Sequence, residues 1–307
     1  MTRLLSGKAI SDERTPLLRA RAGALAARGA QPALAVVRVG ARDDDMAYER
    51  SVIKKAETIG VAVRPVPLRS ETSEAELISE LQRLAEDDSV HGILLFLPLP
   101  EGIDKHTVLA AIPPEKDVDG VTAGSIAAIY EGRTSATYAE AEDKDEGEGG
   151  GAAFAPCTAE AVIAILNYYG IDPGGKTAVV IGRSTVIGKP VGMLLLDLNA
   201  TVVLCHSKTE NLAEQARRAD ILIACAGIAK DGPGTGITAE YLKEGQTVID
   251  VAIHTDDEGG LYGDVDADAA MRIAADYTPV PGGVGSVTTL ILLEHVIRAA
   301  ENLSVGR

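Results

Sequence analysis

One short segment of the 307-residue chain carries the residue types that bind phosphate groups. The apolar run Ala178–Ile181 ends at Gly182, a polar turn with Arg183 and Ser184 follows, and Gly188 opens a segment of helical character. A strand, a turn of small residues and a helix N-terminus together hold a pyrophosphate, because the backbone can approach it closely and the helix dipole favours its charge. The middle glycine of the usual pattern is replaced by Ser184, so an ordinary strand–helix turn with two structural glycines remains an alternative.

The next predicted strand, Thr201–Leu204, leads into the second candidate binding segment. In a dinucleotide-binding unit the end of this strand meets the adenosine ribose, where an acidic residue favours NAD and basic or hydroxyl groups accept the 2′-phosphate of NADP. The segment here reads His206, Ser207 and Lys208, with no carboxylate, and Arg183 lies in the preceding turn. Two cations and a hydroxyl suit a phosphate. We therefore predict that the cofactor is NADP. The alternative is that Lys208 is merely a solvated lysine of the loop.

Composition restricts the class of protein. The chain is 46% hydrophobic and long enough for two domains or one large α/β unit, and its net charge of −16 argues against nucleic-acid binding through a basic surface. Cys157, Cys205 and Cys225 are scattered and odd in number, which indicates a reducing compartment. The chain start lacks the apolar core of a signal peptide, and no apolar run reaches membrane length. We expect a cytoplasmic protein that binds neither nucleic acid nor membrane.

Strands and helices alternate through the first third of the chain. The patterns predict strands at Ala33–Val39, Val61–Leu68 and Val90–Leu97. They predict helices at Ser11–Arg28, Met46–Ile59, Thr72 to about Asp87, and His106–Ile112. This alternation is typical of a parallel α/β domain.

The middle of the chain contains two polar segments of different kinds. Lys116-Asp117-Val118-Asp119-Gly120 reads as a compact turn before a predicted helix at Ala123–Tyr130. Residues 133–152 are acidic, glycine-rich and of low complexity, so we predict a disordered insert. A metal-binding loop is the alternative for the insert, but nothing in it sets ligand geometry, and we expect no metal. Pro156-Cys157-Thr158 then precedes a predicted helix, Ala159–Tyr169.

The second half of the chain alternates in the same way. Beyond the phosphate-binding turn the patterns predict helices at Val191–Leu198 and Thr288–Asn302, and strands at Ile221–Ala224, Thr247–Val251 and near Tyr277. A glycine-rich loop, Pro279–Gly285, precedes the last helix. The predicted fold class is therefore α/β, with two parallel-sheet domains, the second a Rossmann dinucleotide-binding domain.

Taken together, the motifs resemble the methylenetetrahydrofolate dehydrogenase/cyclohydrolase family, of the FolD type, from Val39 to about Arg298. They are Gly60 after the helix of Tyr48, Leu97-Pro98-Leu99-Pro100, Lys116–Gly120, Pro156–Thr158, Gly182–Pro190, Cys205–Thr209, Val248–Val251, Gly263–Val265 and Thr278–Gly285. The resemblance implies two domains around a cleft, with the last helix returning to the first. Residues 1–122 and 286–307 would form the substrate domain, and residues 153–285 the NADP-binding domain. Members of this family are typically dimers, so we expect a homodimer.

The resemblance also implies a reaction and roles for two residues. In that family a hydride passes from 5,10-methylenetetrahydrofolate to NAD(P)⁺, and water then opens the methenyl product to 10-formyltetrahydrofolate. Tyr48 matches the tyrosine that packs against the folate, and Asp119 matches the carboxylate that binds the pterin. A ring face can stack on an aromatic ligand, and a carboxylate can accept two hydrogen bonds from an aminopyrimidinone edge. A half-buried helix tyrosine and a solvated turn aspartate are the alternatives.

The predicted site residues fall into three groups, and no metal ligand is among them. The catalytic residues are Tyr48 and Asp119. The residues predicted to bind a folate-like substrate are Tyr48, Val52, Phe96, Asp119, Pro281, Gly282 and Gly283. The residues predicted to bind the cofactor are Gly182, Arg183, Ser184, Ile187, Gly188, His206, Ser207, Lys208 and Gly227.

Two of these positions depart from the family pattern. The pattern places a proton-handling lysine four residues after the tyrosine, and a glutamine partner in VQLPLP; Val52 and Phe96 stand in their places. Losing one member of a polar pair leaves the other unsatisfied, whereas losing both leaves a consistent apolar wall. We therefore predict a dehydrogenase with weak or absent cyclohydrolase activity. Lesser departures are Ser286, Ala252 and His254.

Three other functions remain open on the sequence alone. The scaffold could oxidise a different cyclic aminal or imine-forming substrate. It could be bifunctional through a relocated acid or base, for which Lys55, seven residues after Tyr48, is the candidate. It could also be a folate- or nucleotide-binding regulatory protein without catalysis.

Overall fold

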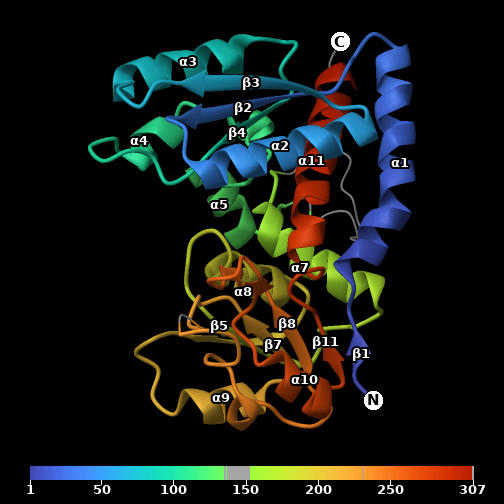
Figure 1. Ribbon diagram of the computed structural model, residues 1–307. Helices are drawn as coiled ribbons and strands as arrows, with labels where there is room; N and C mark the ends of the chain where they lie inside the picture. The colour runs from blue at the N-terminus through green and yellow to red at the C-terminus, as the bar shows by residue number, and fades with distance from the viewer. Residues whose placement is uncertain (135, 137–152, 230, 306–307) are drawn as a thin grey trace. The chain divides into compact units, whose positions relative to one another are not determined.

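The protein divides into two compact units. The computed structural model describes residues 1–134, 136, 153–229 and 231–305. Unit 1 comprises Met1–Ser11 and Thr158–Thr288, and unit 2 comprises Asp12–Cys157 and Thr289–Arg307 (Figure 1). The insert predicted at 133–152 lies outside the described residues except at positions 133, 134 and 136. Across the described ranges, no helix is both long and apolar enough to cross a bilayer.

Unit 2 is built on a three-stranded parallel sheet. Its strand order is β3-β2-β4, with bounds β2 Ala33–Val39, β3 Ala62–Leu68 and β4 Gly92–Leu95. Helix α2, Asp43–Ile59, connects β2 to β3, and helix α3, Glu74–Glu86, connects β3 to β4. Figure 1 shows the two helices on opposite faces of the sheet. Alternate β2 residues, beginning with Ala35, pack with α3, so the other residues of the strand, including Arg38, face the opposite side.

The remaining elements of unit 2 surround this sheet. They are most of α1 (Gly7–Ala27), α4 (Lys105–Leu109), the 3₁₀ turn η1 (Pro114–Lys116), α5 (Ala123–Tyr130) and most of α11 (Gly285–Val305). Two ion pairs join α1 to α11: Arg14 to Glu294 at 2.5 Å and Arg21 to Glu301 at 2.7 Å. These contacts hold the end of the chain in the same unit as its first long helix.

Unit 1 contains a six-stranded parallel sheet of order β1-β11-β8-β7-β5-β6. The strands are β1 Arg3–Leu4, β5 Thr177–Ile181, β6 Thr201–Cys205, β7 Ile221–Ala224, β8 Thr247–Asp250 and β11 Asp276–Tyr277. The helical elements are α7 Cys157–Tyr168, α8 Gly188–Asp197, α9 Leu212–Arg218, η2 Ala239–Tyr241 and α10 Ala267–Ile273. A small antiparallel hairpin, β9 His254–Thr255 with β10 Leu261–Tyr262, stands apart from the main sheet. The predicted α/β class with two parallel sheets is confirmed.

The start of the chain differs from the predicted division. Residues 1–11 were expected in the substrate domain, but they belong to unit 1, because Arg3 and Leu4 pair with Asp276 and Tyr277 of β11. A strand of two residues has no periodicity that a sequence pattern could reveal. The second boundary in the chain was predicted before residue 286, but unit 1 runs to Thr288, inside α11, and unit 2 resumes at Thr289.

Both sheets reverse their strand order at one point. In unit 1, β6 lies on one side of β5 and β7 on the other; in unit 2, β3 lies on one side of β2 and β4 on the other. Open α/β sheets bind ligands in the crevice outside the carboxyl ends of the strands at such a point. The segments after β5 and β7, and those after β2 and β4, are therefore where the fold itself favours binding sites.

Candidate active site

The turn between β5 and α8 has no room for side chains at its two glycines. Gly182 has φ +141°, and a Cβ there would lie 2.6 Å from the carbonyl oxygen of Cys225. A Cβ on Gly188 would lie 2.5 Å from the carbonyl oxygen of Gly182. The Ser184 hydroxyl accepts hydrogen bonds from the amides of Ile187 and Gly188 at 3.2 and 3.4 Å. The serine at the middle position thus orders the start of α8, and the turn keeps the close backbone approach that a pyrophosphate needs.

Parallel pairing brings the second predicted cofactor segment to the same sheet edge. Ile181 of β5 lies opposite Cys205 of β6, so Arg183 and the turn that begins at His206 leave neighbouring strands. The His206 amide donates to the Thr209 hydroxyl at 2.8 Å, and the His206 Nδ1 accepts from the Lys208 amide at 3.2 Å. The His206 ring therefore shapes the turn itself.

The side chains at this corner are available to an anion. Arg183, Ser207 and Lys208 are all exposed. Within the described part of the chain, neither Arg183 nor Lys208 forms an ion pair. Two unpaired cations beside a hydroxyl are the donor set that a phosphate monoester accepts from.

Gly227 lies in the loop after β7, where its amide faces the protein interior. The fully buried carboxylate of Asp264 accepts the backbone amides of Ala226, Gly227, Ile228 and Ala229 at 3.0, 2.8, 2.7 and 3.3 Å. Gly227 itself has φ +65°. The sequence analysis included Asp264 in a family motif but assigned no role to it, although this residue holds the loop.

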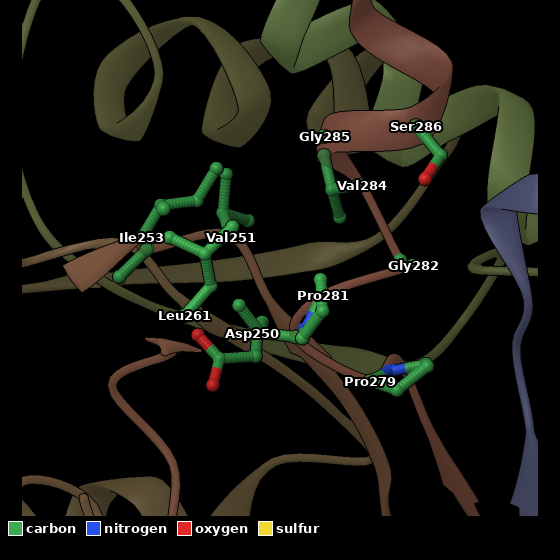
Figure 2. Close-up of a pocket in the computed structure, with 13 residues that line it drawn as sticks. Asp250, Val251, Ile253, Leu261, Pro279, Pro281, Gly282, Val284, Gly285 and Ser286 are labelled. Carbon is green, nitrogen blue, oxygen red and sulfur yellow. The ribbon is translucent and has the colours of Figure 1, made fainter. Parts of the chain in front are cut away.

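A pocket of about 240 Å³ opens beside the carboxyl ends of β8 and β11. It is lined by Asp250–Ile253, Leu261 and Pro279–Ser286, all in unit 1. Figure 2 shows Ile253 and Leu261 on one side and Val284, Gly285 and Ser286 on the other. Ile253 is 58% exposed and Leu261 44% exposed, so apolar surface faces the opening. The structure therefore places the predicted Pro281, Gly282 and Gly283 in a pocket with an apolar wall.

Unit 2 brings Tyr48 and Phe96 together, and Val52 lies on the same helix as Tyr48. The ring centroids of Tyr48 and Phe96 lie 5.5 Å apart at an angle of 36°. Val52, one helical turn after Tyr48, is fully buried, and Phe96 is 7% exposed. Tyr48 as a whole remains 38% exposed. The tyrosine thus offers part of its ring to a ligand beside an apolar wall.

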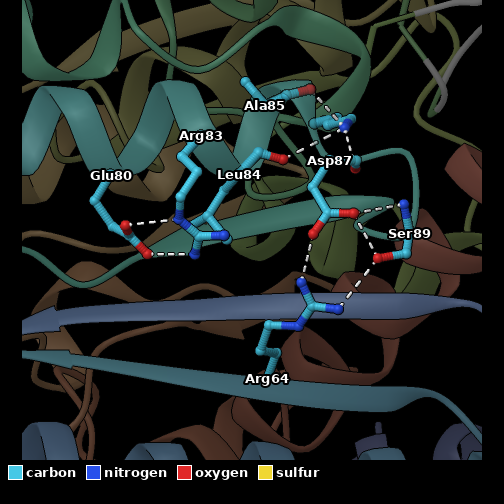
Figure 3. A network of polar contacts seen from close by, with 8 residues as sticks. Arg64, Glu80, Arg83, Leu84, Ala85, Asp87 and Ser89 are labelled. Atoms are coloured by element: carbon cyan, nitrogen blue, oxygen red, sulfur yellow. Dashed lines mark hydrogen bonds and ion pairs between the residues drawn. The ribbon is translucent and has the colours of Figure 1, made fainter.

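The turn that carries Asp119 is anchored by the two residues at its start. The buried Lys116 amine donates to the carbonyls of Ala85 and Asp87 at 2.6 and 2.9 Å, at the end of α3 shown in Figure 3. Asp117 accepts the Thr122 amide at 2.8 Å and the Ser125 hydroxyl at 2.6 Å, at the start of α5. The two residues have structural roles, which sequence reasoning did not assign.

Asp119 follows a carbonyl that is held from two sides. The Val118 oxygen accepts from His295 Nδ1 at 2.8 Å and from the Cys157 thiol at 3.2 Å. Burial, with the negative charge of Asp117, raises the pKa of Asp119 to about 7. Burial and the charge of Asp119 also raise the pKa of Tyr48, so that hydroxyl stays protonated. The charge of Asp119 is therefore felt at the Tyr48 hydroxyl.

Lys55, the candidate for a relocated acid or base, is held by another helix. Its amine donates to the Thr15 hydroxyl of α1 at 2.8 Å, and burial lowers its pKa. Across the described residues, no group of three or more His, Cys, Asp and Glu side chains could hold a metal ion.

Two family profiles match the chain. The profile described as "Tetrahydrofolate dehydrogenase/cyclohydrolase, catalytic domain" matches residues 5–119. The profile described as "Tetrahydrofolate dehydrogenase/cyclohydrolase, NAD(P)-binding domain" matches residues 156–304. The segment left between them contains the predicted insert.

Full-length relatives agree with these profiles. A bifunctional protein FolD from Clostridioides difficile is 41% identical over 298 residues, covering 97% of this chain and 96% of that protein. The crystal structure of the bifunctional FolD enzyme of Campylobacter jejuni superposes with a TM-score of 0.89 at 35% identity, covering 98% of this chain and 99% of that one. A Trypanosoma brucei FolD, crystallised with NADP cofactor and an inhibitor, gives a TM-score of 0.86 at 33% identity, covering 100% and 99%.

Proposed function

Because the chain belongs to the tetrahydrofolate dehydrogenase/cyclohydrolase family, we propose that it is an NADP-dependent methylenetetrahydrofolate dehydrogenase with weak or absent cyclohydrolase activity. It oxidises 5,10-methylenetetrahydrofolate to 5,10-methenyltetrahydrofolate. The observation that carries the second half of the proposal is the apolar contact of Phe96 with Tyr48 beside the fully buried Val52.

The cofactor site of unit 1 fits NADP. When bound, NADP supplies the hydride acceptor of the reaction. The tight glycines Gly182 and Gly188 let the backbone approach the pyrophosphate at the start of α8. Arg183, Ser207 and Lys208 would bind the 2′-phosphate, since a charge-assisted hydrogen bond to a phosphate is among the stronger polar contacts. The apolar pocket wall suits a planar ring.

The substrate side depends on positioning. Asp119 would accept hydrogen bonds from the pterin edge, and the exposed part of the Tyr48 ring would pack on the folate. Hydride transfer requires the reacting carbon to be held close and correctly oriented, and no protein side chain needs to exchange a proton. The residues that position Asp119 and Tyr48 are present, so the oxidation step keeps what it needs.

Hydrolysis of the methenyl product has a different requirement. Water must be activated and protons must move, a contribution commonly worth about 10²–10⁴-fold. Val52 and Phe96 have no proton to exchange, and the Lys55 amine is bonded to Thr15 at 2.8 Å. We therefore propose that the methenyl product leaves the enzyme unhydrolysed.

One sample of protein tests both halves of the proposal. With methylenetetrahydrofolate and NADP, NADPH should form; with methenyltetrahydrofolate, absorbance should decay no faster than in buffer. No NADPH formation with this substrate would favour oxidation of another cyclic aminal. Fast hydrolysis that Lys55→Ala abolishes would establish a relocated acid or base and refute the loss of cyclohydrolase activity.

We also propose that the protein is a homodimer that pairs along β6. This strand is an edge of the six-stranded sheet, contains neither proline nor charge, and exposes 40% of Leu204. The edge strand β3 of unit 2, by contrast, carries Pro65 and Pro67, which block further pairing. Sedimentation equilibrium should give a dimer. Leu204→Pro should give a monomer, because the backbone of Thr201 and Cys205 bonds β5 and the amide of Leu204 therefore points to the free edge. A monomeric unmutated protein would contradict the proposal.

We place the reaction in the cytoplasm. Cys157, Cys205 and Cys225 are all free thiols, which a reducing compartment preserves.

A further inference from the structure

The buried carboxylate of Asp264 has a fifth partner besides the four loop amides. His254 Nε2 lies 2.9 Å from its Oδ1, and the His254 ring stacks on Tyr262 with centroids 5.1 Å apart at 23°. Because the carboxylate of Asp264 only accepts hydrogen bonds, His254 donates through Nε2, as a third donor to Oδ1 beside the amides of Ile228 and Ala229.

Asp264 is fixed from its other side by a second acidic residue. Asp250 accepts the amides of Asp264 and Val265 at 3.0 and 2.9 Å. A Cβ on Gly263 would lie 2.0 Å from the Asp250 carboxylate, so only glycine fits there. The Gly263-Asp264-Val265 motif therefore builds a rigid acceptor, and His254 is the side-chain donor that joins the four loop amides on it.

His254 also belongs to a wall of the pocket. It pairs with Tyr262 across the β9–β10 hairpin. The residues directly before each of them in the chain, Ile253 and Leu261, line the pocket as exposed apolar side chains. The His254–Asp264 bond thus ties the hairpin to the loop Ala226–Ala229 after β7, so one contact orders two segments at the carboxyl edge of the same sheet.

We propose that His254 is a positioning residue for the dinucleotide. Through Asp264 it fixes the backbone of Ala226–Ala229, and through the hairpin it fixes the apolar wall formed by Ile253 and Leu261. The ligand named here rests on the proposed function, but the contacts do not. Losing the donor removes one of three hydrogen bonds to Asp264 Oδ1, which keeps the amides of Ile228 and Ala229, and releases the hairpin from the loop. Binding of a ligand that meets both segments therefore becomes weaker.

The test separates the donor from the ring. His254→Phe keeps an aromatic ring against Tyr262 and removes the donor; His254→Gln keeps an amide donor at a similar reach. NADPH binding is followed by its own fluorescence, which the absence of tryptophan in the chain leaves free of energy transfer from that residue. We expect His254→Phe to raise the dissociation constant about tenfold or more, the scale of a hydrogen bond to a charged group. His254→Gln should stay within about threefold of the unmutated protein, since its donor is retained. In His254→Phe, kcat should stay near the value of the unmutated protein, and KM for NADP should be raised.

The controls keep this inference separate from the proposed function. His106→Phe, an exposed histidine of unit 2, should leave NADPH binding unchanged. Unchanged binding in His254→Phe overturns the inference, and so does equal weakening in His254→Phe and His254→Gln, because the donor would then not matter. If His254→Phe does not fold, His254→Leu makes the same comparison with His254→Gln. Failure to oxidise methylenetetrahydrofolate with normal NADPH binding would refute the proposed function alone.

Discussion

Placing a lysine and a glutamine at the two departing positions should create hydrolytic activity. In the double variant Val52→Lys with Phe96→Gln, the new amine stands one helical turn after Tyr48, with a polar partner where Phe96 now contacts the Tyr48 ring. We expect methenyltetrahydrofolate hydrolysis about 10²–10⁴-fold above the buffer rate, the range of a positioned acid or base.

The single variants should gain less and lose more stability. Val52 is fully buried, so a lone ammonium there loses its hydration without a partner, at a cost of about 3–5 kcal/mol, or it loses its proton. Phe96→Gln removes an aromatic pair worth about 0.5–1.5 kcal/mol. It also buries an amide whose missing hydrogen bonds cost about 1–3 kcal/mol. The family pattern makes each new side chain the other's partner, so we expect the double variant to be more stable than the sum of the singles predicts.

Four proteins and one control measure this coupling. The unmutated protein, both single variants and the double variant are compared by urea unfolding, by decay of methenyl absorbance and by NADPH formation. Ile53→Lys adds a lysine to the same helix at the neighbouring, half-buried position and should not create hydrolysis. NADPH formation in all five proteins shows that the substrate still binds.

Two results would refute the reasoning. Hydrolysis by the unmutated protein at the rate of the double variant would mean that another group moves the proton. A double variant that folds, oxidises methylenetetrahydrofolate and leaves hydrolysis at the buffer rate would mean that these two positions do not govern the step.

Three further predictions follow from the same sites. Arg183→Ala should weaken NADP binding by about 1.5–3 kcal/mol and leave NAD nearly unchanged, with the exposed Arg272→Ala as control; equal affinity for both dinucleotides in the unmutated protein would contradict this. The pKa of Asp119 is raised to about 7, so its carboxyl becomes protonated below that pH and loses an acceptor; folate affinity should rise with pH through 7, and Asp119→Asn should bind weakly at all pH values. Lys116→Met should lower the free energy of unfolding by about 1–3 kcal/mol, because the carbonyls at the end of α3 lose their donor, whereas the exposed Lys105→Met should change it little.

The sequence predicts the longer elements of this fold well. Strand β2, helix α5 and strand β7 have the predicted bounds, because each is bordered by turn residues and has a clear apolar pattern. Strand β1 and the β9–β10 hairpin were not predicted, since two-residue strands form only through partners distant in the chain or across a turn. The sequence therefore identifies both sheets but misplaces the first eleven residues.

The site is predictable at the level of motifs and much less at the level of contacts. Asp119 could be named because its motif resembles that of a family. The partners of Lys116 could not, because they are backbone carbonyls about 30 residues earlier and carry no side-chain signature. His254 was visible as a departure, but its bond to Asp264 depends on the hairpin register.

The hydrogen bonding of buried polar atoms shows how well the apolar residues Val52 and Phe96 fit their surroundings. Within the described residues, the only buried side-chain nitrogen or oxygen without a hydrogen-bond partner is Gln246 Oε1, which belongs to unit 1. A lone replacement at position 52 or 96 would leave such an atom in unit 2, at a cost of about 1–3 kcal/mol. With the apolar side chains Val52 and Phe96 in place, no buried polar side-chain atom is without a hydrogen-bond partner in the described part of unit 2. On the proposed function, the proton carrier and its partner are absent while the anchors of Asp119 stay in place, so the enzyme would lose one step of a two-step reaction without disturbing the other.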